Sequence, residues 1–135
     1  MTNTIAVASD VALLDRKLNH LIQRGEILKA FELYYADNVT MQANDEKATV
    51  GKAANRVREL EFLASIETVH QTKLLSEAVQ GEVSFSEWEL DATYRGSGRT
   101  VRHQVRVRRW AEGKVISEQL YCGAEKPLRQ SCCCH

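Results

Sequence analysis

Apolar residues recur every three or four positions near the start of the chain, which is the spacing of a helix that buries one face. The residues that share this face are Val11, Leu14, Leu18, Leu21 and Ile22. Ser9 or Asp10 can cap the start of the helix, and Gly25 can end it. The pattern therefore predicts a first helix from about residue 9 or 10 to Gly25.

The same spacing predicts two further helices. One runs over about 26–36, and its apolar face comprises Ile27, Leu28, Phe31, Tyr34 and Tyr35. The turn pair Asp37–Asn38 separates it from a short predicted strand over 39–42. The other helix runs over about 51–64, with an apolar stripe of Ala53, Val57, Leu60 and Ala64.

After Ser65 the pattern changes to long strands over about 66–80, 82–95, 99–110 and 114–122. The turns between them carry Gly81, Gly96–Ser97–Gly98 and Glu112–Gly113. Such short connections predict antiparallel hairpins. The chain is therefore predicted to be an α+β domain in which helices cover one face of a twisted sheet.

Composition narrows the class of protein. With 135 residues, 44% of them hydrophobic, the chain can bury a core without a metal or a disulfide. Eighteen basic residues balance eighteen acidic ones, which argues against nucleic acid as a partner. The same balance argues against reading the arginine cluster over Arg102–Arg109 as a nucleic-acid site. No apolar run is long enough to span a membrane, and no signal peptide is recognisable, so we expect a cytoplasmic protein. We expect one domain over 10–123, with tails over 1–9 and 124–135.

The four cysteines do not form a disulfide framework. Cys122 stands alone, and Cys132, Cys133 and Cys134 are adjacent near the C-terminus. Zinc ligands are usually spaced two to four residues apart, so three in a row fit a zinc site poorly. We expect a frayed tail and neither a metal site nor a cofactor, with adventitious metal binding or a redox role as alternatives.

Three stretches together resemble the NTF2-like superfamily, in particular its SnoaL-like members. They are FELYYADNVTM over 31–41, TVGKAANR over 49–56 and RWAEGKV over 109–115. The resemblance covers about residues 10–123. It implies a cone, with three N-terminal helices packed into a curved, mainly antiparallel sheet around a pocket. It also implies a homodimer through the outer face of the sheet.

The chemistries of this superfamily can be carried over position by position. The resemblance places the ketosteroid isomerase base on Ala43, its tyrosine on Leu18, and its acid on Val105, or on Arg106 if the register slips by one. The catalytic positions of limonene-type epoxide hydrolases fall on Trp88, Leu90 and Leu120. Neither catalytic set is present. We therefore expect a protein that binds a small apolar or amphipathic molecule, the alternatives being an isomerase, cyclase or hydratase and an interaction module with a filled cavity.

The turn residues also predict a register for the last strands. A two-residue turn at Gly96–Ser97 would pair Leu90 with His103. A two-residue turn at Glu112–Gly113 would pair Val107 with Glu118. The predicted inner face is then Trp88, Leu90, Ala92, His103, Val105, Val107, Glu118 and Leu120. The predicted outer face, a charged and self-complementary surface for the homodimer, is Glu87, Glu89, Asp91, Arg102, Gln104, Arg106 and Arg108.

His103 and Glu118 are the polar exceptions on that inner face and the first candidates for acid–base chemistry. His70 is a third candidate if a three-residue turn around Gly81 points it inward; a two-residue turn would point it outward. The candidate ligand-binding residues are Tyr35, Met41, Trp88, Leu90 and Leu120. All of them also have a purely structural interpretation. If the register of the strand around His103 is off by one, the pocket groups become Gln104, Arg106 and Arg108, which favours an anionic ligand.

Overall fold

The computed structural model describes residues 3–123, with side chains from residue 10 onward. The elements in chain order are α1 (Asn3–Gln23), α2 (Ile27–Tyr34), β1 (Tyr35–Ala43), β2 (Thr49–Val50), α3 (Lys52–Ser65), β3 (Ile66–Gln80), β4 (Val83–Tyr94), β5 (Gly98–Ala111) and β6 (Lys114–Cys122). The first helix begins earlier than predicted, and β1 takes over the end of the predicted second helix. The predicted C-terminal tail, with its three adjacent cysteines, lies outside the described residues.

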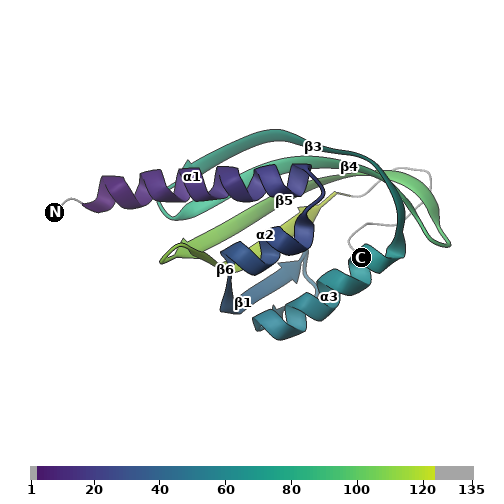
Figure 1. Cartoon of the computed structure of the whole chain (residues 1–135), viewed down its shortest axis with the longest axis horizontal. Coiled ribbons are helices and arrows are strands. Elements are labelled where there is room, and N and C mark those ends of the chain that lie inside the picture. Colours follow the sequence, from purple (N-terminus) through teal and green to yellow (C-terminus); the bar gives the residue numbers. More distant parts are fainter. Residues whose placement is uncertain (1–2, 124–135) are drawn as a thin grey trace.

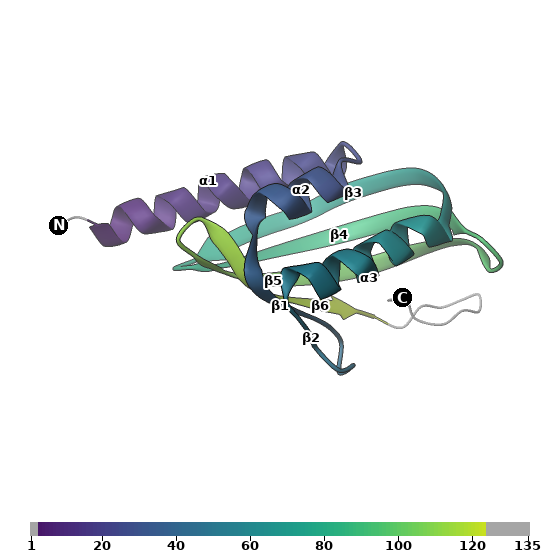
Figure 2. The same cartoon turned by 60° about the horizontal axis from the view of Figure 1, so that its bottom comes forward.

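The strands form one six-stranded sheet in the order β2-β1-β6-β5-β4-β3. All neighbouring strands pair antiparallel except β1 and β6, which are parallel. The three helices lie on the same face, and the long strands curl around them (Figures 1 and 2). This arrangement confirms the predicted α+β cone. Among the described helices, none combines the length and apolar character that a membrane span requires.

The predicted apolar faces of α1 and α2 are confirmed, because they form the core. Leu18 and Ile22 of α1 and Phe31 of α2 are buried against the sheet. On the sheet side, the core contains Trp88, Trp110 and Val115, together with Tyr35 and Val39 of β1. The core therefore lies between α1, α2 and the inner face of the sheet.

The predicted apolar stripe of α3 is wrong. Val57 and Leu60 are 54% and 46% exposed, and the stripe that faces the sheet is Asn55, Glu59 and Phe62. The side chain of buried Asn55 decides this rotation, because its Nδ2 lies within 3.3 Å of the carbonyl oxygens of Val39, Thr49 and Gly51. The polar face of α3 is turned inward, where it borders a cavity rather than a packed core.

The predicted register of β5 against β4 is also wrong, by one residue. Tyr94 pairs with Gly98, so three residues connect the strands, and Leu90 pairs with Arg102 instead of His103. Gly96 and Gly98 have φ values of +85° and +90°, a backbone conformation that glycine adopts without strain. Because side chains alternate between faces, this slip turns the even-numbered residues of β5 inward. Gln104, Arg108 and Trp110 are accordingly buried.

The β5–β6 hairpin combines the predicted turn with an unpredicted bulge. Ala111 pairs with Lys114 across the two-residue turn, as expected. Trp110 then pairs with Val115 but Arg109 with Ser117, which leaves Ile116 as an extra residue. Glu118 therefore faces inward as predicted, but it lies opposite Arg108 rather than Val107.

Candidate functional site

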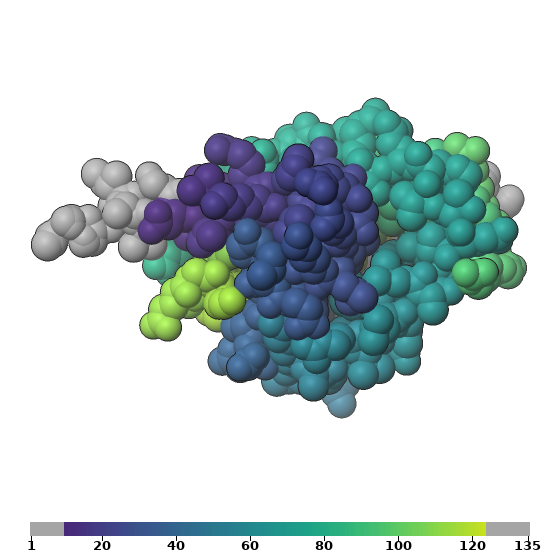
Figure 3. All heavy atoms as spheres, in the orientation of Figure 1, coloured from purple at the N-terminus to yellow at the C-terminus, as the bar shows by residue number. Residues whose placement is uncertain are grey.

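A pocket with a cavity volume of about 120 Å³ lies between α3 and the inner face of the sheet. Its apolar lining comprises Ile22, Ile27, Met41, Ala43, Phe62 and Leu120. Its polar lining comprises Gln42, Lys47, Asn55, Arg58, Glu59, Gln104, Arg106 and Glu118. In the space-filling view, a recess separates the purple-to-blue corner of α1 and α2 from the teal atoms of α3 and β3 (Figure 3).

The floor of the pocket is a row of polar side chains on β5 and β6. Arg106 Nη1 donates to Glu118 Oε2 at 3.3 Å, and Arg106 Nη2 donates to Gln104 Oε1 at 3.4 Å. Both distances are long for charge-assisted hydrogen bonds, and Arg106 Nε has no partner within the described part of the chain. The Arg106 side chain is 23% exposed. Arg106 thus presents a guanidinium with unused donor capacity beside the cavity.

Glu118 lies at the inner edge of this floor and is held in its charged form. Tyr35 donates its hydroxyl to Oε1 at 2.6 Å, and Arg108 Nε donates to Oε2 at 3.4 Å. Burial alone would raise the pKa of Glu118, but the charges of Arg108 and Arg106 and the Tyr35 hydrogen bond outweigh it and lower the pKa. Burial and the Glu118 charge in turn raise the pKa of the Tyr35 phenol well above its usual value, so the hydroxyl keeps its proton.

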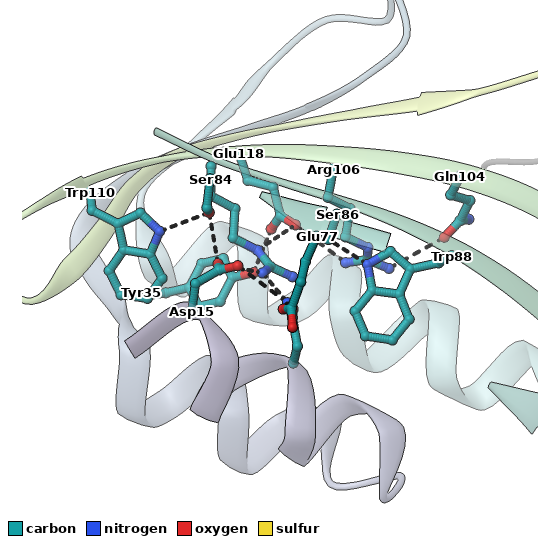
Figure 4. Close-up of polar contacts among 12 residues, drawn as sticks. Asp15, Tyr35, Glu77, Ser84, Ser86, Trp88, Gln104, Arg106, Trp110 and Glu118 are labelled. Atoms are coloured by element: carbon teal, nitrogen blue, oxygen red, sulfur yellow. Dashed lines mark hydrogen bonds and ion pairs between the residues drawn. The ribbon is translucent and has the colours of Figure 1, made fainter. Parts of the chain in front are cut away.

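Behind the floor, Arg108 joins the site to α1. Its Nη1 donates to Asp15 Oδ1 at 2.9 Å and to Asn19 Oδ1 at 2.7 Å. Asp15 Oδ1 also accepts from the Ser84 hydroxyl, which in turn accepts from the indole of Trp110 (Figure 4). Since every member is buried, this network holds the position of the pocket floor relative to the helix layer.

Glu59 faces the same cavity from α3 and differs from Glu118 in its surroundings. It is half-buried and accepts no hydrogen bond from the residues that the structure describes. Burial raises the pKa of Glu59, the Arg106 charge lowers it, and the Glu118 charge raises it; the net change is upward. One pocket therefore holds two carboxyl groups whose pKa values are shifted in opposite directions, an arrangement that suits separate acid and base roles.

Neither predicted histidine lines the pocket. His103 is exposed on the outer face, with Nε2 2.9 Å from Glu89 Oε2, because the register slip reverses its orientation. His70 is exposed as well, with Nε2 2.8 Å from Thr93 Oγ1. The β3–β4 connection is the two-residue form, since Gln80 pairs with Val83, but it does not decide the direction of His70 alone. A bulge at Leu75 reverses the alternation along β3, and a second bulge leaves His70 unpaired between Val69 and Gln71. The predicted inward position of His103 is wrong, and of the two directions left open for His70 the structure shows the outward one.

The other predicted site residues divide between the pocket and the core. Met41, Leu120 and Glu118 line the pocket. Tyr35 lies behind Glu118, and Trp88 is buried with its indole nitrogen donating to Ser86. Neither of these aromatic residues nor Leu90 lines the cavity.

Sequence reasoning missed Glu59 and placed Arg106 on the pocket only in its alternative register. The spacing of Asn55, Glu59 and Phe62 was the available signal for α3, since these positions share one helical face. Of the two positions to which the isomerase acid carries over, Arg106 lines the pocket and Val105 is exposed. Arginine cannot act as a neutral acid, so that catalytic set remains incomplete.

Comparison with known proteins assigns the family. The SnoaL-like domain matches residues 9–122, and the chain therefore belongs to the SnoaL-like family within the NTF2-like superfamily. No curated protein matches the chain.

Solved structures show the same fold. A candidate SnoaL-like polyketide cyclase from Mesorhizobium loti superposes with a TM-score of 0.76 at 23% identity, covering 82% of this chain and 97% of that one. An NTF2-like protein of unknown function from Cytophaga hutchinsonii gives 0.68 at 9% identity, covering 82% and 96%. AclR, a candidate hydroxylase from Streptomyces galilaeus, gives 0.70 at 14% identity, covering 86% and 90%.

Proposed function

We propose that this protein binds a small organic carboxylate in the pocket between α3 and the sheet. Arg106 is the anchor, because its guanidinium borders the cavity and makes only two long hydrogen bonds. Arginine donates two parallel N–H groups that match the two oxygens of a carboxylate. Lys47 and Arg58 add positive charge to the lining, while Glu118 is already neutralised by Arg106 and Arg108.

The apolar part of the lining defines the rest of the ligand. Met41, Phe62 and Leu120 can cover a ring or a short hydrocarbon chain. A cavity of about 150 Å³ holds benzene in a protein interior. The cavity of about 120 Å³, open at one side, therefore suits a single ring whose carboxylate points toward Arg106.

Titration with sodium benzoate tests this proposal, with binding followed by NMR chemical-shift changes. Benzyl alcohol is the uncharged comparison of similar shape. Arg106→Met should weaken benzoate binding about tenfold to a hundredfold, since a hydrogen bond to a charged group contributes about 1.5–3 kcal/mol. Arg109→Met is the matched control, because Arg109 is exposed on the same strand. The proposal is wrong if the wild type does not bind benzoate at millimolar concentration, or if folded Arg106→Met binds it equally well.

The second candidate is an acid–base enzyme, and the opposite pKa shifts of Glu59 and Glu118 favour it. In its ionised form, a half-buried carboxylate with a raised pKa can accept a proton from a carbon next to a carbonyl, while Arg106 stabilises the oxygen that becomes negative. The cyclase and hydroxylase descriptions of two similar structures are compatible with such chemistry. The wild-type protein should exchange the α-hydrogens of cyclohexanone for deuterium faster than D2O buffer alone does, as followed by NMR. Glu59→Gln should exchange them more slowly than the wild type. A rate equal to that of buffer would exclude this activity on that ketone.

A further inference from the structure

Glu59 lies across the cavity from Arg106, and its neighbours come from every element around the pocket. The charged or titratable groups that share the cavity with it are Lys47 before β2, Arg58 on α3, Arg106 on β5 and Glu118 on β6. The corner of α1 and α2 contributes only Ile22 and Ile27. Because Glu59 accepts no hydrogen bond from the described residues, its ionised form depends on the Arg106 charge for stabilisation.

We infer that the pocket takes up a carboxylate together with one proton, and that Glu59 holds this proton. The inference rests on the proposed carboxylate site at Arg106. A bound carboxylate would place a further negative charge beside Glu59. It would also pair with the Arg106 guanidinium, whose charge otherwise favours the ionised form of Glu59. Two carboxylates that share a site cannot both stay ionised without a large penalty, so one of them binds a proton. The carboxyl of Glu59 then becomes an O–H donor toward the ligand.

The remaining groups of the pocket cannot take this proton as readily. Glu118 keeps its charge through Tyr35, Arg106 and Arg108, which together lower its pKa. Lys47 and Arg58 are already cationic, and no histidine is among the described lining residues. Burial, together with the Glu118 charge, already raises the pKa of free Glu59, so the shift needed on binding is small.

Measurement of the benzoate dissociation constant between pH 6 and pH 8 tests the inference. If one proton enters with the ligand, wild-type affinity should fall about tenfold for each pH unit above the pKa of free Glu59. Glu59→Gln carries a permanent neutral donor and should bind benzoate with little pH dependence. Glu61→Gln is the matched control, because Glu61 is exposed on the same helix, and it should keep the wild-type slope.

Proton uptake by the wild type gives a second readout that needs no variant. Benzoate added to concentrated protein in weak buffer containing phenol red should raise the pH by the equivalent of one proton for each ligand bound. Benzoate binding without proton uptake, or an unchanged slope in Glu59→Gln, would overturn the inference and leave the proposed function standing. Absence of benzoate binding at every pH, in the wild type and in Glu59→Gln, would overturn the proposed function itself.

Discussion

Arg108, Asp15 and Glu118 are charged side chains that are almost wholly inaccessible to solvent. Taking such groups out of water costs several kcal/mol for each ion, and the cost is offset only when partners are well placed. Arg108 has carboxylates on both sides, and Glu118 has two guanidinium groups and the Tyr35 hydroxyl. Arg108 therefore links the two carboxylates, and loss of any of the three side chains leaves a less compensated charge in the interior.

The first prediction concerns Glu118→Gln, which removes a buried charge and leaves two guanidinium groups less compensated. We expect a loss of about 3–5 kcal/mol in the free energy of unfolding at pH 7, measured by urea denaturation. The folded-state pKa of Glu118 lies below its usual value of 4.5. Its contribution to stability is therefore complete above about pH 4.5 and is lost as the pH falls through the lower folded-state pKa.

The difference between wild type and Glu118→Gln should consequently shrink in acid. Glu61→Gln serves as the control, since this exposed glutamate on α3 should change stability little at any of these pH values. A difference that stays constant from pH 7 to well below pH 4.5 would show that Glu118 is not held ionised by its partners.

At the scale of elements, the connections decide which side chains reach the pocket. The three-residue connection between β4 and β5 turns Arg106 inward, and the bulge at Ile116 keeps Glu118 inward beside it. A two-residue turn without a bulge would have placed His103 inside instead. The pocket chemistry of this protein therefore depends on backbone geometry outside the pocket.

The second prediction concerns this connection. Gly98 has a φ of +90°, with no atom near the position of an added Cβ, so Gly98→Ala should cost about 1–2 kcal/mol through backbone strain alone. Gly123→Ala is the control, because it also has open space and no positive φ. Thermal unfolding measures both variants. Equal stability of Gly98→Ala and Gly123→Ala would show that the connection tolerates another conformation.

At the scale of the whole molecule, the outer face of the sheet differs from the surface that the sequence predicts. Arg106 and Arg108 point inward, and Arg102 lies over the Tyr94 ring at 4.0 Å. The predicted self-complementary surface of arginines and acids is therefore wrong. The exposed apolar residues of β4, β5 and β6 are Phe85, Val101, Val105, Ile116 and Tyr121.

We propose that this face joins two copies of the chain, because clustered exposed apolar residues indicate an interaction surface. The third prediction is a homodimer in analytical ultracentrifugation at micromolar concentration. Val105→Lys should shift it toward monomer, since a charge would be buried in the interface. Val57→Lys should not, because Val57 is exposed on α3, away from the sheet face. A wild type that is monomeric throughout this range would contradict the proposal.

The sequence by itself determined the three helices, the four long strands, the fold class and the buried faces of α1 and α2. Those properties depend on local periodicity. The apolar face of α1, with Leu18 and Ile22, and that of α2, with Phe31, can each be recognised from a short stretch of sequence. The family resemblance supports the same fold class, because the motifs that carry it are also short stretches of sequence.

Only the tertiary structure decided the pocket. Over 101–108 of β5, valine or histidine occupies the odd positions and glutamine or arginine the even ones, so the apolar pattern favours His103, Val105 and Val107 as the inner set. The opposite register is stable because the partners of Arg108 come from distant parts of the chain, Asp15 from α1 and Glu118 from β6. Burial of an arginine is favourable only when such partners converge on it, and that convergence exists only once the chain has folded.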